Sequence, residues 1–153
     1  MRSLTIEDMN VGDSASSSKT VTEADVWAFA GISGDFNPVH VDAEFAKRSK
    51  FGARVAHGPL TLALVAGVTG TQLPGVGAIG LGVELEFKLP VYIGDTITSR
   101  VEVAEIDRER NVVRLALTAT NQRGELVAVG SARLNPARKP ALQLEGVGAH
   151  LRT

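Results

Sequence analysis

A carboxylate and an imidazole stand close together in one short segment of this chain. In the stretch Gly31-Ile-Ser-Gly-Asp-Phe-Asn-Pro-Val-His-Val41, Asp35 precedes His40 by five residues. Such a pair can hold a water molecule and move protons near neutral pH, because histidine titrates there and a carboxylate can orient its ring or accept a proton. Five extended residues would separate the two side chains by up to ~17 Å. The chemistry therefore requires the chain to fold back on itself.

Turn-forming residues lie between the acid and the base. Gly34 can adopt a positive φ, and Pro38 fixes its own φ and moves Asn37 away from the helical region. Phe36 and Val39 are the apolar residues that would pin the bend to a core. We therefore expect a compact, non-helical loop on which the acid and the base converge. The same pattern also suits an ordinary surface turn, in which the acid caps the turn and the histidine starts the next element.

The composition indicates a single soluble globular domain. The chain has 153 residues, of which 44% are hydrophobic and 22% charged. Its net charge of -1 implies no general affinity for nucleic acid or anionic membranes. The lack of cysteine excludes disulfides, thiolate metal sites and cysteine nucleophiles. The three histidines, His40, His57 and His150, are too dispersed along the sequence to predict a metal site.

Neither a signal sequence nor a membrane span is predicted. The N-terminal residues contain no apolar signal region, and the longest apolar run, residues 60–68, is too short to cross a bilayer. A cytoplasmic protein is therefore expected.

The first half of the chain is predicted to be helical. Thr22 can cap a helix and is followed by acids in the first turn, and Gly34 predicts the end of that helix. Asp42 is expected to cap a short second helix that runs through Ala46, with Phe45 facing inward.

A third helix is predicted to begin at Gly58-Pro59, with proline at its first helical position. From Leu60 to Val68 this helix is apolar on nearly every side, with Thr61 as the exception. A helix that is apolar all round is buried, so we expect it to run through the middle of the domain.

The second half of the chain is predicted to form antiparallel strands. Apolar and polar residues alternate, and short polar turns separate the runs, which predicts a meander of consecutive strands. The strands are expected at residues 80–89, 97–103, 113–117 and 125–134. A curled antiparallel sheet wrapped around a central buried helix is the α+β hot-dog fold, expected over residues 1–135, with a loosely ordered C-terminal tail over 136–153. The exposed sheet edge would need a cover, which favours a homodimer or a dimer-based oligomer.

Several segments resemble one known family. Phe29-Ala-Gly-Ile-Ser-Gly-Asp-Phe-Asn-Pro-Val-His40 resembles the signature of the MaoC-like, (R)-specific enoyl-CoA hydratases, which have a hot-dog fold. The resemblance continues through Val55-Ala-His-Gly58, Gln72-Leu-Pro-Gly75 and Phe87-Lys-Leu-Pro-Val-Tyr-Ile-Gly-Asp95, and so covers most of the chain. It implies a hydro-lyase that adds water in syn fashion to a trans-2-enoyl-CoA, giving an (R)-3-hydroxyacyl-CoA, or runs the reverse dehydration.

The resemblance also implies roles for three residues. Asp35 and His40 match the catalytic dyad, and Gly58 matches the glycine whose backbone N–H holds the thioester oxygen. The chemistry agrees, because addition of water to the β-carbon gives an enolate-like intermediate. A free N–H at a helix N-terminus suits that negative oxygen, since the donor is unpaired and the helix dipole is favourable.

Further residues are expected around the dyad. Asn37 should tie down the bend through its amide, with Ser33 as a second supporting residue, and His57 should either shape the pocket or satisfy a buried loop. Ala66 stands in the central helix where some family members carry a polar side chain. No cofactor and no metal are implied, because the coenzyme A thioester is the substrate itself. Candidate cations for its phosphates are Lys47, Arg48, Lys50, Arg54 and Lys88, although such a cluster also suits a solvated surface.

Two other functions stay open at this point. A hot-dog acyl-CoA thioesterase would direct water to the carbonyl carbon, and a non-catalytic acyl-thioester-binding subunit would need no dyad. The Asp35–His40 pair favours the hydratase. The sequence also leaves open the acyl chain length and which residue makes each proton transfer. It does not show whether a second subunit completes the site. The pathway is open as well, for example polyhydroxyalkanoate monomer supply or fatty acid metabolism.

Overall fold

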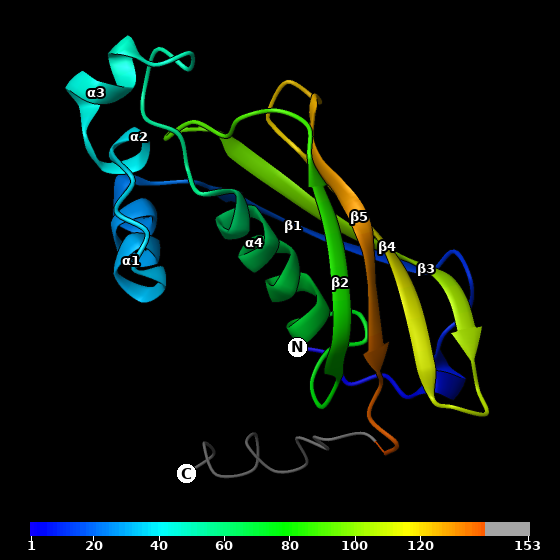
Figure 1. The fold of residues 1–153 in the computed structure, drawn as a ribbon. Helices are drawn as coiled ribbons and strands as arrows, with labels where there is room; N and C mark the ends of the chain where they lie inside the picture. Colours follow the sequence, from blue (N-terminus) through cyan, green and yellow to red (C-terminus); the bar gives the residue numbers. More distant parts are fainter. Residues whose placement is uncertain (140–153) are drawn as a thin grey trace, which may run out of the picture.

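Five antiparallel strands form one curled sheet that wraps around helix α4 (Figure 1). The structure is a computed structural model that describes residues 1–139. Its elements are η1 (Ile6–Asp8), β1 (Ser14–Thr20), α1 (Glu23–Ser33), α2 (Pro38–Val41), α3 (Ala43–Arg48), α4 (Gly58–Thr71), β2 (Ile79–Phe87), β3 (Thr96–Asp107), β4 (Val112–Thr120) and β5 (Leu126–Asn135). The predicted α+β hot-dog fold is confirmed.

The strand order in the sheet is β1-β3-β4-β5-β2. Strands β3, β4 and β5 form the predicted meander, but the prediction was wrong for β2, which pairs with β5 and lies at the edge. The reason is the connection from β2 to β3, which crosses the end of the sheet instead of making a hairpin. On its way the Lys88 N–H bonds to the carbonyl of Val127, and the carbonyl of Val91 accepts from Ala56. Strand β2 is thereby left with one unpaired side in the described chain.

Strand β1 was not predicted from the sequence. Its residues Ser-Ala-Ser-Ser-Ser-Lys-Thr are almost all polar and exposed, so they show no alternation of apolar and polar positions. They pair antiparallel with β3, from Ser14 opposite Glu102 to Thr20 opposite Thr96. A polar edge strand of this kind resists pairing with other chains, because it offers no apolar surface to bury.

Helix α4 lies in the concave face of the sheet and supplies one side of the core. Val65 and Val68 pack in one cluster with Leu115 and Leu117 of β4. The helix was predicted to be buried all round, but Ala63, Ala66, Gly67 and Gly70 are exposed in the single chain. The sheet lies on one side of the helix and does not enclose it (Figure 1).

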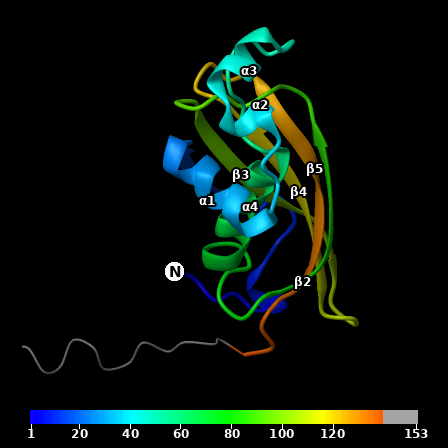
Figure 2. The ribbon, with the colours of Figure 1, turned by 60° about the vertical axis from the view of Figure 1, so that its left-hand side comes forward.

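Helices α1, α2 and α3 stand at one end of the molecule, on the side of α4 that faces away from the sheet (Figures 1 and 2). Val26 of α1 is buried in a cluster with Leu60 of α4 and Ile97 of β3. This contact fixes the first turn of α1 near the beginning of α4. The inward position expected for Phe45 on α3 was wrong, because its side chain is exposed.

The domain was expected to end at residue 135, which is where β5 ends. The next two residues, Pro136 and Ala137, are buried, and the Asn111 side chain donates to the Pro136 carbonyl at 2.9 Å. The rest of the expected tail, from residue 140, lies outside the described residues. No helix within the described part of the chain is long and apolar enough to cross a membrane.

Candidate active site

The end of α1 presents Asp35. Thr22 caps this helix as expected, and Gly34 ends it in the left-handed region with φ 75°, where a glycine carries no steric cost. The Ser33 hydroxyl donates to the Phe29 carbonyl at 2.7 Å and accepts from the Asp35 N–H at 3.2 Å. Ser33 therefore fixes the backbone from which the carboxylate projects.

A short helix presents His40. The segment was expected to be non-helical throughout, but Pro38–Val41 form the single-turn helix α2, because proline suits its first turn and Asn37 caps it. The Asn37 side-chain oxygen accepts from the Val39 N–H at 3.3 Å. The backbone N–H of Asn37 donates to Asp35 Oδ1 at 3.1 Å. Phe36 does not pin the bend to a core as expected, since its side chain is exposed.

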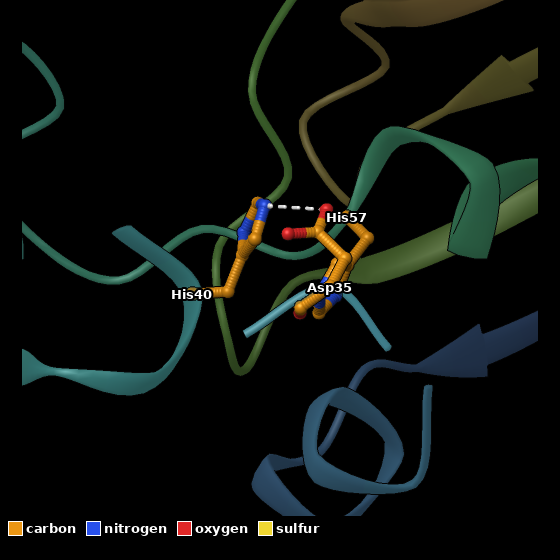
Figure 3. Close-up of side chains that lie close together, drawn as sticks. All are labelled: Asp35, His40 and His57. Atoms are coloured by element: carbon orange, nitrogen blue, oxygen red, sulfur yellow. Dashed lines mark hydrogen bonds and ion pairs between the residues drawn. The ribbon is translucent and has the colours of Figure 1, made fainter. Parts of the chain in front are cut away.

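The acid and the base meet at this bend (Figure 3). His40 Nε2 lies 3.8 Å from Asp35 Oδ2. His40 Nδ1 is 2.8 Å from the Val55 carbonyl, which can only accept, so Nδ1 carries a proton and Nε2 faces the carboxylate. The His40 side chain is 13% exposed and that of Asp35 52% exposed. A separation of 3.8 Å exceeds a direct hydrogen bond and leaves both atoms able to bind the same small molecule beside them.

His57 connects the dyad to helix α4. It is 1% exposed, immediately precedes α4, and its Nε2 donates to the Asp35 carbonyl at 2.9 Å. Its ring stacks on that of His40, with centroids 3.8 Å apart and planes at 29°. Its Nδ1 is enclosed and has no partner among the described residues. His40 and His57 are therefore neighbours in the structure although they are 17 residues apart in the sequence. The expectation that the dispersed histidines lie apart was wrong for this pair.

The same three residues are the described group best placed for a metal. One ligand atom from each of Asp35, His40 and His57 lies within 4.8 Å of the others. The geometry suits a metal poorly, because stacked imidazoles direct their nitrogen lone pairs along nearly parallel planes instead of towards one point. Each ring also has one nitrogen within hydrogen-bond distance of a backbone carbonyl.

The N-terminus of α4 offers one free backbone donor beside the dyad. The Gly58 N–H has no acceptor among residues 1–139, Pro59 has none to donate, and the Leu60 N–H bonds to the His57 carbonyl at 3.0 Å. Gly58 is the first helical residue, so proline stands second and not first as expected. A Cβ at Gly58 would lie 2.9 Å from the Phe87 ring, so a larger residue would displace that ring.

One cavity of about 490 Å³ lies beside these groups, and Asp35 is not part of its lining. His40, His57 and Gly58 line it, as do Thr61 of α4 and Phe87 of β2. In the sequence Thr61 stands out only as an exception in an apolar run, and no role was predicted for Phe87. The helical period was the signal for Thr61, because a residue three positions after Gly58 lies on the same face of the helix.

The five candidate cations divide into two groups. Lys50 and Lys88 line the cavity, and Lys88 also pairs with Glu86. Lys47, Arg48 and Arg54 are not part of the lining, and Arg54 is held by Glu23 at 2.7 Å.

A second cavity of about 430 Å³ continues along α4 and is mostly apolar. It lies between α4 and strands β2 and β5, and Ala66 is part of its wall. The other lining residues are Leu62, Val65, Thr69, Gly80, Leu81, Gly82, Val83, Leu117, Ala132, Arg133 and Leu134.

The fold is a hot-dog fold, and its site places an acid, a base and a free backbone N–H near one another. An acid and a base that face one point can bind water and transfer its protons, and the free N–H at the helix end can hold a negative oxygen.

Comparisons with known proteins give the family. A family model described as "MaoC like domain" matches residues 10–123. An "(R)-specific enoyl-CoA hydratase" of Rhodospirillum rubrum is 44% identical over 133 residues, covering 86% of this chain and 92% of that protein. A "3-hydroxybutyryl-CoA dehydratase" of Methylorubrum extorquens is 45% identical over 120 residues, covering 78% and 76%. The unliganded R-hydratase of Pseudomonas aeruginosa has a TM-score of 0.88 at 36% identity and covers 95% of this chain and 94% of its own. The chain therefore belongs to the MaoC-like family of (R)-specific hydratases and is a hydro-lyase.

Proposed function

We propose that the protein adds water in syn fashion to trans-2-enoyl-CoA thioesters, giving (R)-3-hydroxyacyl-CoA, and catalyses the reverse dehydration. The observation that carries the proposal is the position of His40 and Gly58 on one cavity, with Asp35 3.8 Å from His40. The names of the relatives from Rhodospirillum rubrum and Methylorubrum extorquens support a coenzyme A thioester as substrate.

Asp35 and His40 act on one water molecule. Held by Asp35 Oδ2 and His40 Nε2, the water loses a proton to the pair as its oxygen attacks the β-carbon, and the pair returns a proton to the α-carbon. Both transfers come from one side of the substrate, because Asp35 Oδ2 lies 3.8 Å from His40 Nε2 and His40 lines the cavity. Addition of both parts of water to the same face is syn addition.

Gly58 stabilises the charge that develops meanwhile. Attack at the β-carbon shifts electrons to the thioester oxygen, and the unpaired Gly58 N–H and the positive end of the α4 dipole face that oxygen. Loss of one such donor typically raises a barrier by ~3–4 kcal/mol. Of the candidate cations, Lys50 and Lys88 are the pair placed to bind the phosphates of coenzyme A, because both line the cavity.

A second copy of the chain completes the sheet edge. Strand β2 has an unpaired side and carries exposed Ile79, Leu81 and Val83, and the exposed face of α4 consists of alanine and glycine. An apolar unpaired edge favours strand pairing, and small residues allow close approach of a partner helix. A homodimer joined through β2 would bury both surfaces.

The deciding experiment follows crotonyl-CoA with the purified protein. We expect loss of the enoyl absorbance, no release of free thiol, and an (R) product on chiral analysis. Thiol release without loss of the enoyl absorbance would support the thioesterase instead, and an (S) product would contradict the proposal. Binding of enoyl-CoA without turnover at any chain length would support a non-catalytic subunit.

A further inference from the structure

Thr61 lines the cavity, and its hydroxyl group has no hydrogen-bond partner among the described residues. The residue is 3% exposed and lines the cavity together with His40, His57 and Gly58. No residue in the described part of the chain bonds to its hydroxyl. Two described side-chain atoms are fully enclosed without a partner, His57 Nδ1 and Ser99 Oγ. The Thr61 oxygen also lacks a partner but is not one of these enclosed atoms, so it retains some accessible surface. That surface can face the cavity, because the residue is 3% exposed and lines it.

A buried hydroxyl is seldom left unsatisfied. Leaving such a group without a hydrogen bond costs ~1–3 kcal/mol, so the Thr61 hydroxyl is available to a water molecule or a substrate group that enters the cavity. Two other threonines of α4 show the alternative: Thr69 donates to the Ala66 carbonyl at 3.1 Å and Thr71 to the Gly67 carbonyl at 2.7 Å. Thr61 makes no such bond back to its own helix.

Among the first three residues of α4, the backbone supplies one free donor. The Gly58 N–H is free, Pro59 has no N–H, and the Leu60 N–H is occupied by the His57 carbonyl. Side chains on a helix lean towards its N-terminus, so Thr61, three residues after Gly58, covers the turn that carries the free N–H. A hydroxyl can donate as well as accept.

We propose that the Thr61 hydroxyl donates a second hydrogen bond to the thioester oxygen, beside the Gly58 N–H. This inference rests on the proposed function. The bond strengthens as the oxygen gains negative charge in the enolate-like intermediate, and no proton is transferred through it. Thr61 is then a catalytic residue that acts on the transition state more than on substrate binding.

The test compares three variants in hydration of crotonyl-CoA. Thr61→Val has almost the same shape but no hydroxyl, Thr61→Ser retains the hydroxyl, and Thr71→Val removes a hydroxyl elsewhere on α4. We expect Thr61→Val to lower kcat by about 100-fold, as for loss of one oxyanion donor. Its KM should change little, because a transition-state interaction is lost. Thr61→Ser should retain most of the kcat, and Thr71→Val should match the wild type.

The outcomes separate this inference from the proposed function. If the wild type hydrates crotonyl-CoA and Thr61→Val retains its kcat, the second donor does not exist. Equal losses in Thr61→Val and Thr61→Ser would show that shape matters and not the hydroxyl, which also overturns the inference. A wild type without hydratase activity overturns the proposed function itself. The melting temperature of each variant is measured, and Thr61→Ala replaces Thr61→Val if the latter does not fold.

Discussion

His57 stacks on the ring of His40 and, through its own Nε2, holds the backbone carbonyl of Asp35. The ring centroids are 3.8 Å apart and the hydrogen bond is 2.9 Å long. One buried side chain thus touches both members of the dyad, while its backbone leads into Gly58. The relative position of acid, base and helix end therefore depends on a residue that faces away from solvent.

Two replacements of His57 separate its stacking from its hydrogen bond. His57→Gln retains an amide donor near the position of Nε2 but loses the ring, and His57→Phe retains the ring but loses the donor. Because misplacement of a reacting group by ~1 Å costs about 100-fold, we expect each variant to lower kcat by about 10- to 100-fold with a smaller effect on KM. Steady-state kinetics with crotonyl-CoA checks this. Native kcat in both variants would show that His57 only fills space.

The dyad itself can be tested with substitutions that preserve its supports. Asp35→Asn retains an oxygen for the Asn37 N–H, and His40→Asn retains a donor for the Val55 carbonyl. We expect each to lower kcat by about 10² to 10⁴-fold, the usual contribution of general acid–base catalysis. Unchanged circular dichroism and melting temperature would show that the loss is chemical. Activity near that of the wild type in both variants would mean that other groups handle the water.

The sequence sufficed to predict that Asp35 and His40 lie close together, because the bend is local. Turn formers between Asp35 and His40 fold the chain back, which brings the two residues near each other. The stacking of His57 on His40 could not be predicted from the sequence, because it depends on how α2 packs against the beginning of α4. A histidine beside a glycine carries no local sign of that contact.

The strands show the same division between local and long-range information. Strands β3, β4 and β5 follow from alternation and short turns, but the place of β2 next to β5 depends on a connection that crosses the sheet. Strand β1 is polar on both faces and gives no periodic signal. The exposed face of α4 was missed because alanine and glycine suit a buried helix as well as a contact between two chains.

Gly58 should tolerate no side chain without loss of activity. In Gly58→Ala the new Cβ would lie 2.9 Å from the ring of Phe87, a half-exposed side chain that can move. We expect the ring to shift into the cavity and lower kcat/KM by about 10-fold or more through misplacement of the thioester, with little change in melting temperature. Phe87→Ala serves as the matched control, and the double variant should recover part of the loss. Full activity in Gly58→Ala would contradict a tight fit of the thioester at this helix end.

Asp25 should make the stability of α1 depend on pH. Hydrogen bonds from Lys19 and then from Thr22 lower the pKa of Asp25 from 3.8 to about 2. Because the pKa is lower in the folded state, the carboxylate stabilises the fold at neutral pH, and this contribution is lost as the pH falls from 3.8 to about 2. Asp25→Asn should lower the free energy of unfolding at pH 7 by about 0.5–1 kcal/mol, since the pair is partly exposed.

Urea unfolding across this pH range checks the prediction. The difference between Asp25→Asn and the wild type should shrink towards zero as the pH approaches about 2. Glu109→Gln removes an exposed acid in the turn between β3 and β4 and should leave the unfolding free energy unchanged at each pH. A difference for Asp25→Asn that stays constant with pH would rule out its charge as the cause.

The proposed dimer can be tested at the β2 edge. Val83 on β2 is 45% exposed and lines the apolar cavity beside α4, whereas Val11 is 66% exposed in the turn before β1. Val83→Lys would place a charge in the interface, because β2 is the strand expected to pair with its copy. Val11→Lys adds the same charge far from that edge.

We expect light scattering on gel filtration to give a dimer for the wild type and for Val11→Lys, and a shift towards monomer for Val83→Lys. A wild type that is monomeric at micromolar concentration, or a Val83→Lys variant that remains fully dimeric, would mean that β2 is not the joining edge.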